Sequence, residues 1–319
     1  MGVKKSLKNS LSTTISFQDL FSFFLAAKKA SNLAEATIKN YEDTEKNFTK
    51  IFGEGITASD ITENTVITYI NYLQDKGLNG VSINTRLRTL RAILYWGMDR
   101  GYITPFKIHL VKEQEVIVDT YTREELKALL KKPKKKDDFR EWRTWAIINY
   151  ILATGNRAAT VRNIKMEDVD FKSKEVILAH TKNKRAQVVP ISSTLESVLK
   201  EYVSLWRARA KPTDFLFCGI NEAQLSDTSI HQSIRKYNHS RGVQKTGLHA
   251  LRHTFAKEWI MNNGDVFRLQ KLLGHSTLDM TKRYVRMFNQ DLKQDFDVYN
   301  PLDNLNKSFN RSHTVTRCK

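Results

Sequence analysis

Apolar side chains recur every three to four positions through residues 16–103, and polar side chains fill the positions between them. That spacing gathers the apolar residues on one face of a helix and predicts a series of amphipathic helices. Ser16 and Asp19 form a capping-box start for the first of them. Helices with short connections predict a compact bundle, and four are expected at residues 16–27, 37–52, 66–73 and 82–94.

The pattern changes after Pro105. Residues 105–120 contain apolar side chains without a helical period, so we interpret them as an extended linker. Farther along, two short β-rich runs at 174–179 and 186–191 are joined by a polar turn, which is typical of a hairpin. The sequence therefore predicts a mainly α protein with a small β-sheet, whose second domain, residues 121–290, is mixed α/β. Helices in that domain are expected at 125–130, 142–153, 194–209, 227–240, 248–263, 265–273 and around Tyr284.

Charge is the first indication of a partner. Lysine and arginine outnumber aspartate and glutamate by 52 to 34, which gives a formal net charge of +18. Residues 1–110 hold 14 basic and 10 acidic side chains, and the remainder holds 38 and 24. A spread excess of this kind favours contact with nucleic acid over a wide surface, although a merely soluble basic protein has the same composition. No uninterrupted apolar stretch approaches the ~20 residues of a membrane span.

The two cysteines, Cys218 and Cys318, match no metal-binding spacing. Cys218 stands in the apolar run Phe-Leu-Phe-Cys and is expected to be a small buried hydrophobe. The first ten residues contain lysines but no apolar signal core. These features favour a reduced, cytoplasmic compartment.

The second domain offers the groups that phosphodiester cleavage needs. Cleavage without a metal needs a nucleophile, cations around the non-bridging oxygens and an acid for the leaving oxygen. Arginine suits the second task because its planar fork matches two phosphate oxygens. Gly155 permits a tight chain break just before an arginine, and a histidine and an arginine share a helical face at i and i+3. The candidates are Arg157, Lys182 in the hairpin turn, His249, Arg252, His275 and, nine residues later, Tyr284.

This set of motifs resembles the tyrosine recombinase (phage integrase) family. The family pattern is T-G-x-R, a hairpin lysine, H-x-x-R, L-G-H and a tyrosine nine residues after that histidine, all in this order. The helical domain, residues 16–104, is similar to the family's SAM-like core-binding domain, with Ser-Ile-Asn-Thr at 82–85 and Gly-Tyr-Ile at 101–103. The resemblance implies a site-specific recombinase or integrase that cleaves and rejoins DNA with neither ATP, metal nor any other cofactor.

The resemblance also implies a role for each candidate. Lys184 and Arg185 are alternatives to the hairpin lysine as the acid. Thr160 stands where the family usually has an acidic residue, and Thr181 and Asn183 stand where it usually has a glycine pair. The implied roles are phosphate binding by Arg157 and Arg252, protonation of the leaving 5′ oxygen by Lys182, help in taking the tyrosine proton by His249, a phosphate hydrogen bond from His275, and a 3′-phosphotyrosyl bond to Tyr284.

Partners follow from the same resemblance. Double-stranded DNA would lie between the two domains, and four subunits on paired sites would exchange strands through a Holliday junction, in the cytoplasm at the nucleoid. On the fourth predicted helix, a polar stripe contains Asn84 and Tyr95. A basic face there could enter a DNA groove or be only solvated. The DNA-binding candidates on it are Arg86, Arg88 and Arg91.

Two other functions remain open from the sequence. One is strand relaxation of the type IB topoisomerase kind, and the other is a non-catalytic DNA-binding regulator on the same scaffold. His249 and His253, at i and i+4, could instead bind zinc, although no third ligand stands at a suitable spacing.

The ends of the chain carry two further expectations. The short N-terminal extension, residues 1–15, resembles the simpler Xer-like or short integrase type. In the C-terminal tail, residues 291–319, apolar residues at Leu292, Phe296 and Tyr299 predict a helix that contacts a neighbouring subunit or packs on its own domain.

Overall fold

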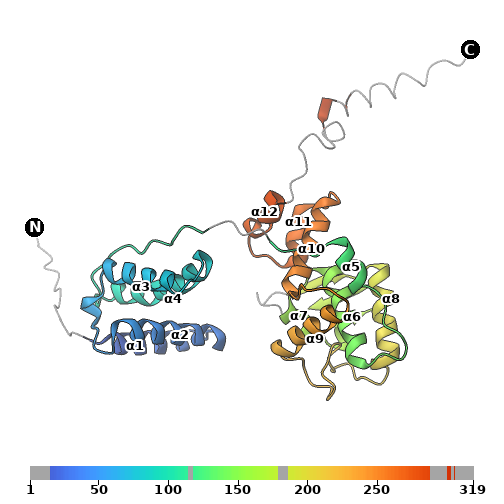
Figure 1. Cartoon of the computed structure of the whole chain (residues 1–319), viewed down its shortest axis with the longest axis horizontal. Coiled ribbons are helices and arrows are strands. Elements are labelled where there is room, and N and C mark those ends of the chain that lie inside the picture. Colours follow the sequence, from blue (N-terminus) through green and yellow to red (C-terminus); the bar gives the residue numbers. More distant parts are fainter. Residues whose placement is uncertain (1–14, 114–117, 179–185, 288–299, 303–304, 306–319) are drawn as a thin grey trace, which may run out of the picture. The chain divides into compact units, whose positions relative to one another are not determined.

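The computed structural model describes residues 15–113, 118–178, 186–287, 300–302 and 305 of the 319-residue chain. Two compact units divide the chain, residues 1–116 and 117–319. Each has its own apolar core, and helices dominate both (Figure 1).

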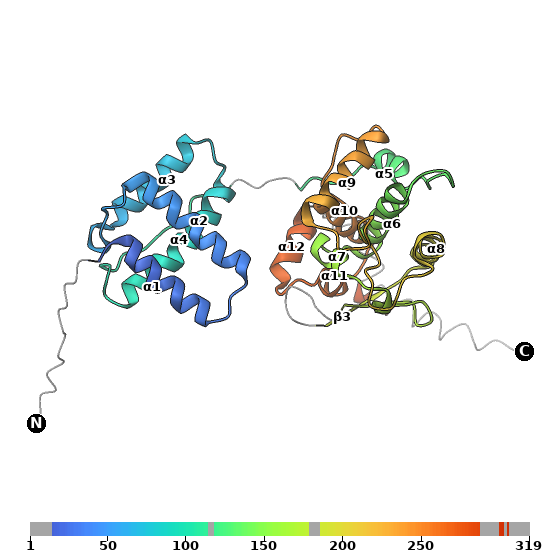
Figure 2. The same cartoon turned by 90° about the horizontal axis from the view of Figure 1, so that it is seen from below.

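The first unit is the predicted bundle of four helices (Figure 2). The cap expected at Ser16 is present, since its hydroxyl accepts a hydrogen bond from the Asp19 amide at 3.0 Å. The fourth helix begins two residues earlier than predicted, because the Asn79 side chain caps it by accepting from the amide of Ser82 at 2.9 Å. The helices are α1 (Phe17–Ala30), α2 (Glu35–Phe52), α3 (Glu63–Asp75) and α4 (Gly80–Asp99), with a 3₁₀ turn at Ala58–Asp60.

Two polar residues of α4 bind the extended segment that follows the bundle. Asn84 is only 2% exposed, and its amide accepts from the Val111 N–H at 2.9 Å and donates to the Val111 carbonyl at 2.8 Å. The Tyr95 hydroxyl accepts from the Ile108 N–H at 3.0 Å. The polar stripe predicted as a possible DNA face is therefore corrected in part: Asn84 and Tyr95 hold the first unit's own chain.

The second unit is built around one helix that is buried on nearly every side. This helix, α6 (Phe139–Thr154), packs against α8, α9 and α10. The predicted hairpin belongs to a three-stranded antiparallel sheet of order β1-β2-β3, in which Val176 pairs with Val189. Cys218 is 1% exposed, which confirms its predicted burial.

The boundaries in this unit differ from the prediction in several places. The segment expected at 194–209 leaves α-helical geometry after Tyr202 and continues as a π-helical turn, Val203–Arg207. Neither α7 nor β1 was predicted, because six and two residues are too short to show a period. The remaining elements are α5 (Arg123–Leu129), α7 (Ala158–Asn163), β1 (Val169–Asp170), β2 (Glu175–Leu178), β3 (Gln187–Pro190), α8 (Ser193–Tyr202), α9 (Asp227–Ser240), α10 (Leu248–Met261), α11 (Val266–Leu273) and α12 (Leu278–Met287).

Three of these helices, α10, α11 and α12, pack on one another through a small apolar cluster of their own. Tyr284 of α12 belongs to it and is 5% exposed. The other members are Phe255, Ala256, Leu269 and Leu273.

Candidate active site

The first arginine of the motif set is placed by a left-handed glycine. Gly155 ends α6 with φ +67, a conformation that glycine adopts without strain. A Cβ on this residue would lie 2.4 Å from the ring of Phe255, so the chain passes too close to α10 for any side chain. The backbone then turns, and Arg157 becomes the N-cap residue of α7. Its Nη1 donates to the Leu273 carbonyl at 3.4 Å.

The second arginine of the motif set contacts the ends of two helices. Arg252, on α10, is 5% exposed. Its Nη1 donates to the Gly155 carbonyl at 2.6 Å, and its Nη2 donates to the Leu273 carbonyl at 2.8 Å. Burial, and after it the charge of Arg157, lower the pKa of Arg252 to about 10, so the guanidinium stays charged at neutral pH. Both arginines therefore meet at the end of α11.

The histidine of the L-G-H motif is held by two partners. Gly274 ends α11 with φ +60, and His275 follows it. The ring's Nε2 lies 2.9 Å from Arg252 Nη2, and its Nδ1 lies 2.8 Å from the Thr281 hydroxyl. Because a guanidinium can only donate, Nε2 is the accepting nitrogen and the proton sits on Nδ1. Burial, followed by Arg252 and Arg157, lowers the pKa of His275 to about 4, which keeps the ring neutral.

Tyr284 lies beside these groups. Its ring is stacked nearly parallel to that of His275, with an interplanar angle of 4° and centroids 6.3 Å apart. Burial raises the pKa of the Tyr284 hydroxyl, and the positive charges of Arg252, Arg283 and Arg157 act against that rise. The tyrosine predicted as nucleophile thus lies among the residues predicted to bind phosphate.

A histidine that was not expected to contact the tyrosine does so. Nδ1 of His253 lies 2.6 Å from the Tyr284 hydroxyl. The sequence had assigned help with the tyrosine proton to His249, and His253 entered only as half of a zinc pair. Burial lowers the pKa of His249 most, and the charges of Arg252 and of His231 on α9 lower it further. Both histidines stand in the run His-Ala-Leu-Arg-His, and the spacing alone does not say which one meets Tyr284.

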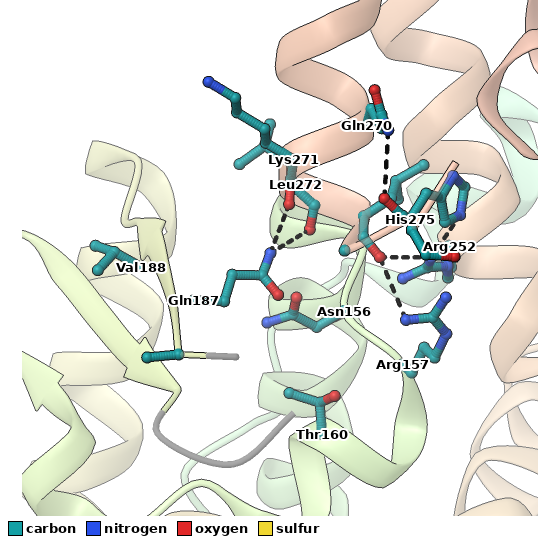
Figure 3. A pocket seen from close by; sticks show the side chains of 14 residues that line it. Asn156, Arg157, Thr160, Gln187, Val188, Arg252, Gln270, Lys271, Leu272 and His275 are labelled. Atoms are coloured by element: carbon teal, nitrogen blue, oxygen red, sulfur yellow. Dashed lines mark hydrogen bonds between the residues drawn. The ribbon is translucent and has the colours of Figure 1, made fainter. Parts of the chain in front are cut away.

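The hairpin lysine, Lys182, lies outside the described residues, as do its alternatives Lys184 and Arg185. The structure does describe Gln187, the first residue of the strand that follows the turn. Its Nε2 donates to the carbonyls of Lys271 and Leu272 at 2.9 and 2.8 Å (Figure 3). Gln187 therefore fixes the start of β3 to the last turn of α11, a link that no pattern in the sequence indicates.

One open cleft of about 760 Å³ is lined by Arg157, Arg252 and His275, whereas Tyr284 and the two histidines of α10 are not among its lining residues. Arg157, Arg252 and His275 come to it from three separate parts of the second unit, and Thr160 and Gln187 line it as well (Figure 3). Two guanidinium groups in a cleft lined by polar side chains can hold an anion with the geometry of a phosphate. Among the residues described, no three or more His, Cys, Asp or Glu side chains gather where they could hold a metal ion.

Comparison with known proteins agrees with this geometry. Residues 120–291, more than half of the chain, match the phage integrase family, and residues 5–114 match the phage integrase SAM-like domain. The tyrosine recombinase XerC of Staphylococcus aureus (strain USA300 / TCH1516) is 26% identical over 279 residues, which is 85% of this chain and 93% of that protein. The chain belongs to the phage integrase family of tyrosine recombinases, and the predicted family is confirmed.

Solved structures show the same fold. The Tn1549 transposon integrase in complex with a circular intermediate DNA has a TM-score of 0.73 at 18% identity, covering 93% of this chain and 100% of that one. The XerH site-specific recombinase bound to its palindromic difH substrate has a TM-score of 0.69 at 20% identity, covering 89% and 85%. A lambda integrase tetramer bound to a Holliday junction has a TM-score of 0.67 at 16% identity, covering 87% and 83%. The predicted mainly α, two-domain fold with a small sheet is confirmed.

None of the helices in the described ranges is both long enough and apolar enough to cross a membrane.

Proposed function

We propose that this protein recombines DNA at specific sites by attacking one phosphodiester per subunit with the hydroxyl of Tyr284. One observation carries the proposal: Arg157, Arg252 and His275 converge on a single cleft, and Tyr284 is packed against them. Two guanidinium cations around one phosphate position, with a hydroxyl nearby, match what transesterification at phosphorus requires.

The arginines supply electrostatic stabilisation. A guanidinium has five N–H groups, so Arg252 can bond the Gly155 and Leu273 carbonyls and still offer donors to a phosphate. Because these carbonyls hold it in place, the charge is in position before the substrate arrives, and no reorganisation is needed as negative charge builds on the phosphate oxygens. Arg157 would bind the same phosphate from the α6–α7 turn.

Cleavage would transfer the phosphate from a 5′ oxygen to the tyrosine. The Tyr284 oxygen forms a bond to phosphorus, the bond to the 5′ oxygen breaks, and Lys182 gives that oxygen its proton. A 3′-phosphotyrosyl ester conserves the energy of the broken bond, so a 5′ hydroxyl from a second strand can attack it and rejoin the DNA. In this proposal neither ATP nor a metal takes part.

The proposed partners are double-stranded DNA and three further copies of the chain. The structural neighbours include a recombinase on its DNA site and a tetramer on a Holliday junction, which supports this assembly. The proposed place of action is the nucleoid in the cytoplasm. Contact between the tail, residues 291–299, and a neighbouring subunit remains a proposal as well, because that segment lies outside the described residues.

The test is covalent capture. Nicked duplexes with a randomised core let the protein select its site, and the loss of the short strand beyond the nick traps the tyrosyl adduct. The wild-type chain should yield DNA attached to a peptide that contains Tyr284. Tyr284→Phe should bind DNA equally well and form no adduct, whereas Tyr72→Phe, at a half-buried tyrosine of α3, serves as the matched control and should form it.

Other outcomes would separate the alternatives. An adduct in Tyr284→Phe would place the nucleophile elsewhere. DNA binding without any adduct in the wild-type chain would favour the non-catalytic regulator. Relaxation of a supercoiled plasmid that lacks the selected site, without strand exchange between two sites, would favour the topoisomerase activity.

A further inference from the structure

The hydroxyl of Thr281 is buried against the ring of His275. Thr281 lies on α12 and is 0% exposed, and its Oγ1 is 2.8 Å from Nδ1 of the ring. It precedes Tyr284 by three positions, so the two side chains share one face of the helix. We propose that Thr281 is a positioning residue whose hydroxyl orients His275 and allows its Nε2 to change from hydrogen-bond acceptor to donor when a phosphate binds. This inference rests on the proposed function, since it concerns a residue of the same phosphate site.

A hydroxyl at a fully buried position is unfavourable unless it is hydrogen-bonded, because it loses its bonds to water. Valine has nearly the same shape as threonine and would fill this place in α12 without that cost. The helix packs against α10 and α11, where Tyr284 joins an apolar cluster. The bond to His275 therefore accounts for a threonine in surroundings that would otherwise favour an apolar residue.

The backbone of His275 is held independently of its ring. Its N–H donates to the Gln270 carbonyl at 3.1 Å, and Nε2 of Gln270 donates to the His275 carbonyl at 3.4 Å (Figure 3). The orientation of the ring is set by three side chains. Arg252 contacts its Nε2, Thr281 contacts its Nδ1, and Tyr284 stacks on its face. Loss of the Thr281 hydroxyl would leave the Nδ1 edge free to rotate.

In the free protein the ring is not arranged to donate to a phosphate. Nη2 of Arg252 donates to Nε2, so the ring proton sits on Nδ1 and is donated to the Thr281 hydroxyl. Burial, followed by the charges of Arg252 and Arg157, lowers the pKa of His275 to about 4, so a second ring proton is absent at neutral pH. A phosphate oxygen accepts hydrogen bonds, and a bare Nε2 has no proton to donate.

A phosphate in the cleft favours the other arrangement. Arg252 and His275 line the same cleft, so a phosphate there competes for the guanidinium and places an acceptor near Nε2. The ring proton leaves Nδ1 to water and another binds Nε2, so the ring takes up no net proton. Nδ1 then carries a lone pair, and the Thr281 hydroxyl rotates to donate to it. A hydroxyl serves both arrangements because it donates as well as accepts, whereas a carboxylate only accepts.

Substitutions can separate the hydroxyl from the shape of the side chain. Thr281→Val keeps the shape and removes the hydroxyl, and Thr281→Ser does the opposite. Thr144→Val is the matched control, because Thr144 is 2% exposed in the same unit and its hydroxyl donates to the Arg140 carbonyl at 2.7 Å. The measurement is the single-turnover rate of adduct formation on the selected nicked duplex. We expect Thr281→Val to be slower by about 10- to 100-fold, the range found when a hydrogen bond that orients a metal-binding histidine is removed. Thr281→Ser and Thr144→Val should stay near the wild-type rate.

Nuclear magnetic resonance of isotope-labelled histidine reads the protonation pattern directly, because a ring nitrogen that carries a proton resonates far from a bare one. The signals of His275 are assigned by their loss in His275→Gln. The free full-length chain should show a protonated Nδ1 and a bare Nε2. The Tyr284→Phe chain on the selected duplex, which it cannot cleave, should show the reverse. Adding Thr281→Val to that complex should abolish the reversed pattern, because valine donates nothing to Nδ1.

Each outcome decides the inference. A wild-type rate of adduct formation in Thr281→Val would overturn it, and so would an equal loss in Thr281→Ser, which would assign the effect to shape. In the complex, a bare Nε2 would show that no exchange occurs, and protons on both nitrogens would show that His275 acts as a cation; either result overturns the proposed change. If Thr281→Val fails to unfold cooperatively on heating, the comparison of the free and DNA-bound chains still decides, because it needs no substitution at Thr281. The wild-type adduct is measured first: no adduct, together with a reversed pattern on DNA, would overturn the proposed function and leave this inference standing.

Discussion

Nη2 of Arg252 lies 2.9 Å from Nε2 of His275, and the same Nη2 donates to the Leu273 carbonyl at 2.8 Å. One guanidinium thereby joins Leu273, the last residue of α11, to His275 two positions later, while its Nη1 reaches the end of α6 at Gly155. The segments that carry the T-G-x-R, H-x-x-R and L-G-H motifs are thus connected through a single buried side chain.

Arg252→Lys should therefore fail in both folding and chemistry. A lysine keeps the positive charge, but its single ammonium cannot reach the Gly155 carbonyl, the Leu273 carbonyl and His275 in fixed directions. Each buried carbonyl left without a donor costs about 1–3 kcal/mol. We expect a lower free energy of unfolding in urea and a loss of adduct formation of at least about 100-fold, which corresponds to about 2.7 kcal/mol in the barrier.

Arg286→Lys is the matched control, because Arg286 is exposed on α12. It should leave both the unfolding curve and the adduct rate near those of the wild-type chain. An Arg252→Lys protein with wild-type stability and activity would show that charge alone suffices at this position.

Two of the predicted site residues, Arg157 and His275, stand after glycines whose backbone geometry is a local signal. Gly155 before Arg157 and Gly274 before His275 both adopt the left-handed conformation that their place at a helix end requires. Such a signal is contained within a few neighbouring residues. The order of the motifs then indicated a common site, and the structure brings Arg157, Arg252, His275 and Tyr284 together.

Residues whose role depends on a distant partner could not be predicted in this way. Asn84 looks like one of several polar residues on α4 until Val111, 27 positions later, is seen to pair with it. Gln187 bonds carbonyls 84 and 85 positions away. His253 and Tyr284 are 31 positions apart, and no periodicity in the chain encodes that distance. Their contacts form only when distant segments pack together, so the sequence of each segment alone does not indicate them.

The hydrogen bonds of Gln187 lead to a prediction about how the proposed acid, Lys182, is positioned. The amide of Gln187 holds the start of β3 against α11, and Lys182 precedes Gln187 by five residues in the sequence. Gln187→Ala should slow cleavage of ordinary DNA by about 10-fold, as expected for about 1.4 kcal/mol of lost positioning. The loss should be smaller on DNA with sulfur in place of the bridging 5′ oxygen, because a thiolate leaves without a proton.

Lys182→Ala is the reference in the same assay. It should lose activity on ordinary DNA and recover on the sulfur substrate if Lys182 is the acid. If Lys182→Ala is equally slow on both substrates, Lys184 or Arg185 becomes the candidate. If Gln187→Ala cleaves both substrates at the wild-type rate, the link between β3 and α11 has no part in positioning the acid.

Acid should destabilise the second unit through its buried histidines. The pKa values of His253 and His275 are each lowered to about 4, against about 6.5 for a histidine in an unfolded chain. Between these two values the unfolded chain binds more protons than the folded one, so stability falls as the pH falls from about 6.5 to about 4. Above pH 7 neither state binds these protons, and the histidines contribute no pH dependence.

The measurement is the melting temperature as a function of pH, compared between the wild-type chain and His253→Asn. Removing one titrating group should make the decline between pH 6.5 and pH 4 shallower. The control is His239→Asn, since His239 is exposed at the end of α9, and it should follow the wild-type curve. Parallel curves for all three proteins would mean that His253 does not contribute to the loss of stability in acid.

Three arginines of α4 give the last prediction, which separates DNA contact from structural support. Arg86, Arg88 and Arg91 remain the proposed DNA-binding residues, and Nη2 of Arg88 lies 3.2 Å from a Glu113 carboxylate oxygen in an exposed pair. If these arginines contact phosphates, replacing each with alanine should weaken binding and reduce the slope of log affinity against log salt by about 0.9 per lost contact. Glu113→Gln should strengthen binding, because Arg88 no longer shares its charge with a carboxylate.

Asn84→Ala is the contrasting variant. It should lower the unfolding free energy of the first unit by about 1–3 kcal/mol, because buried backbone groups at Val111 lose their partner. It should leave the salt slope of DNA binding unchanged. An unchanged slope in all three arginine variants would show that these side chains make no phosphate contact.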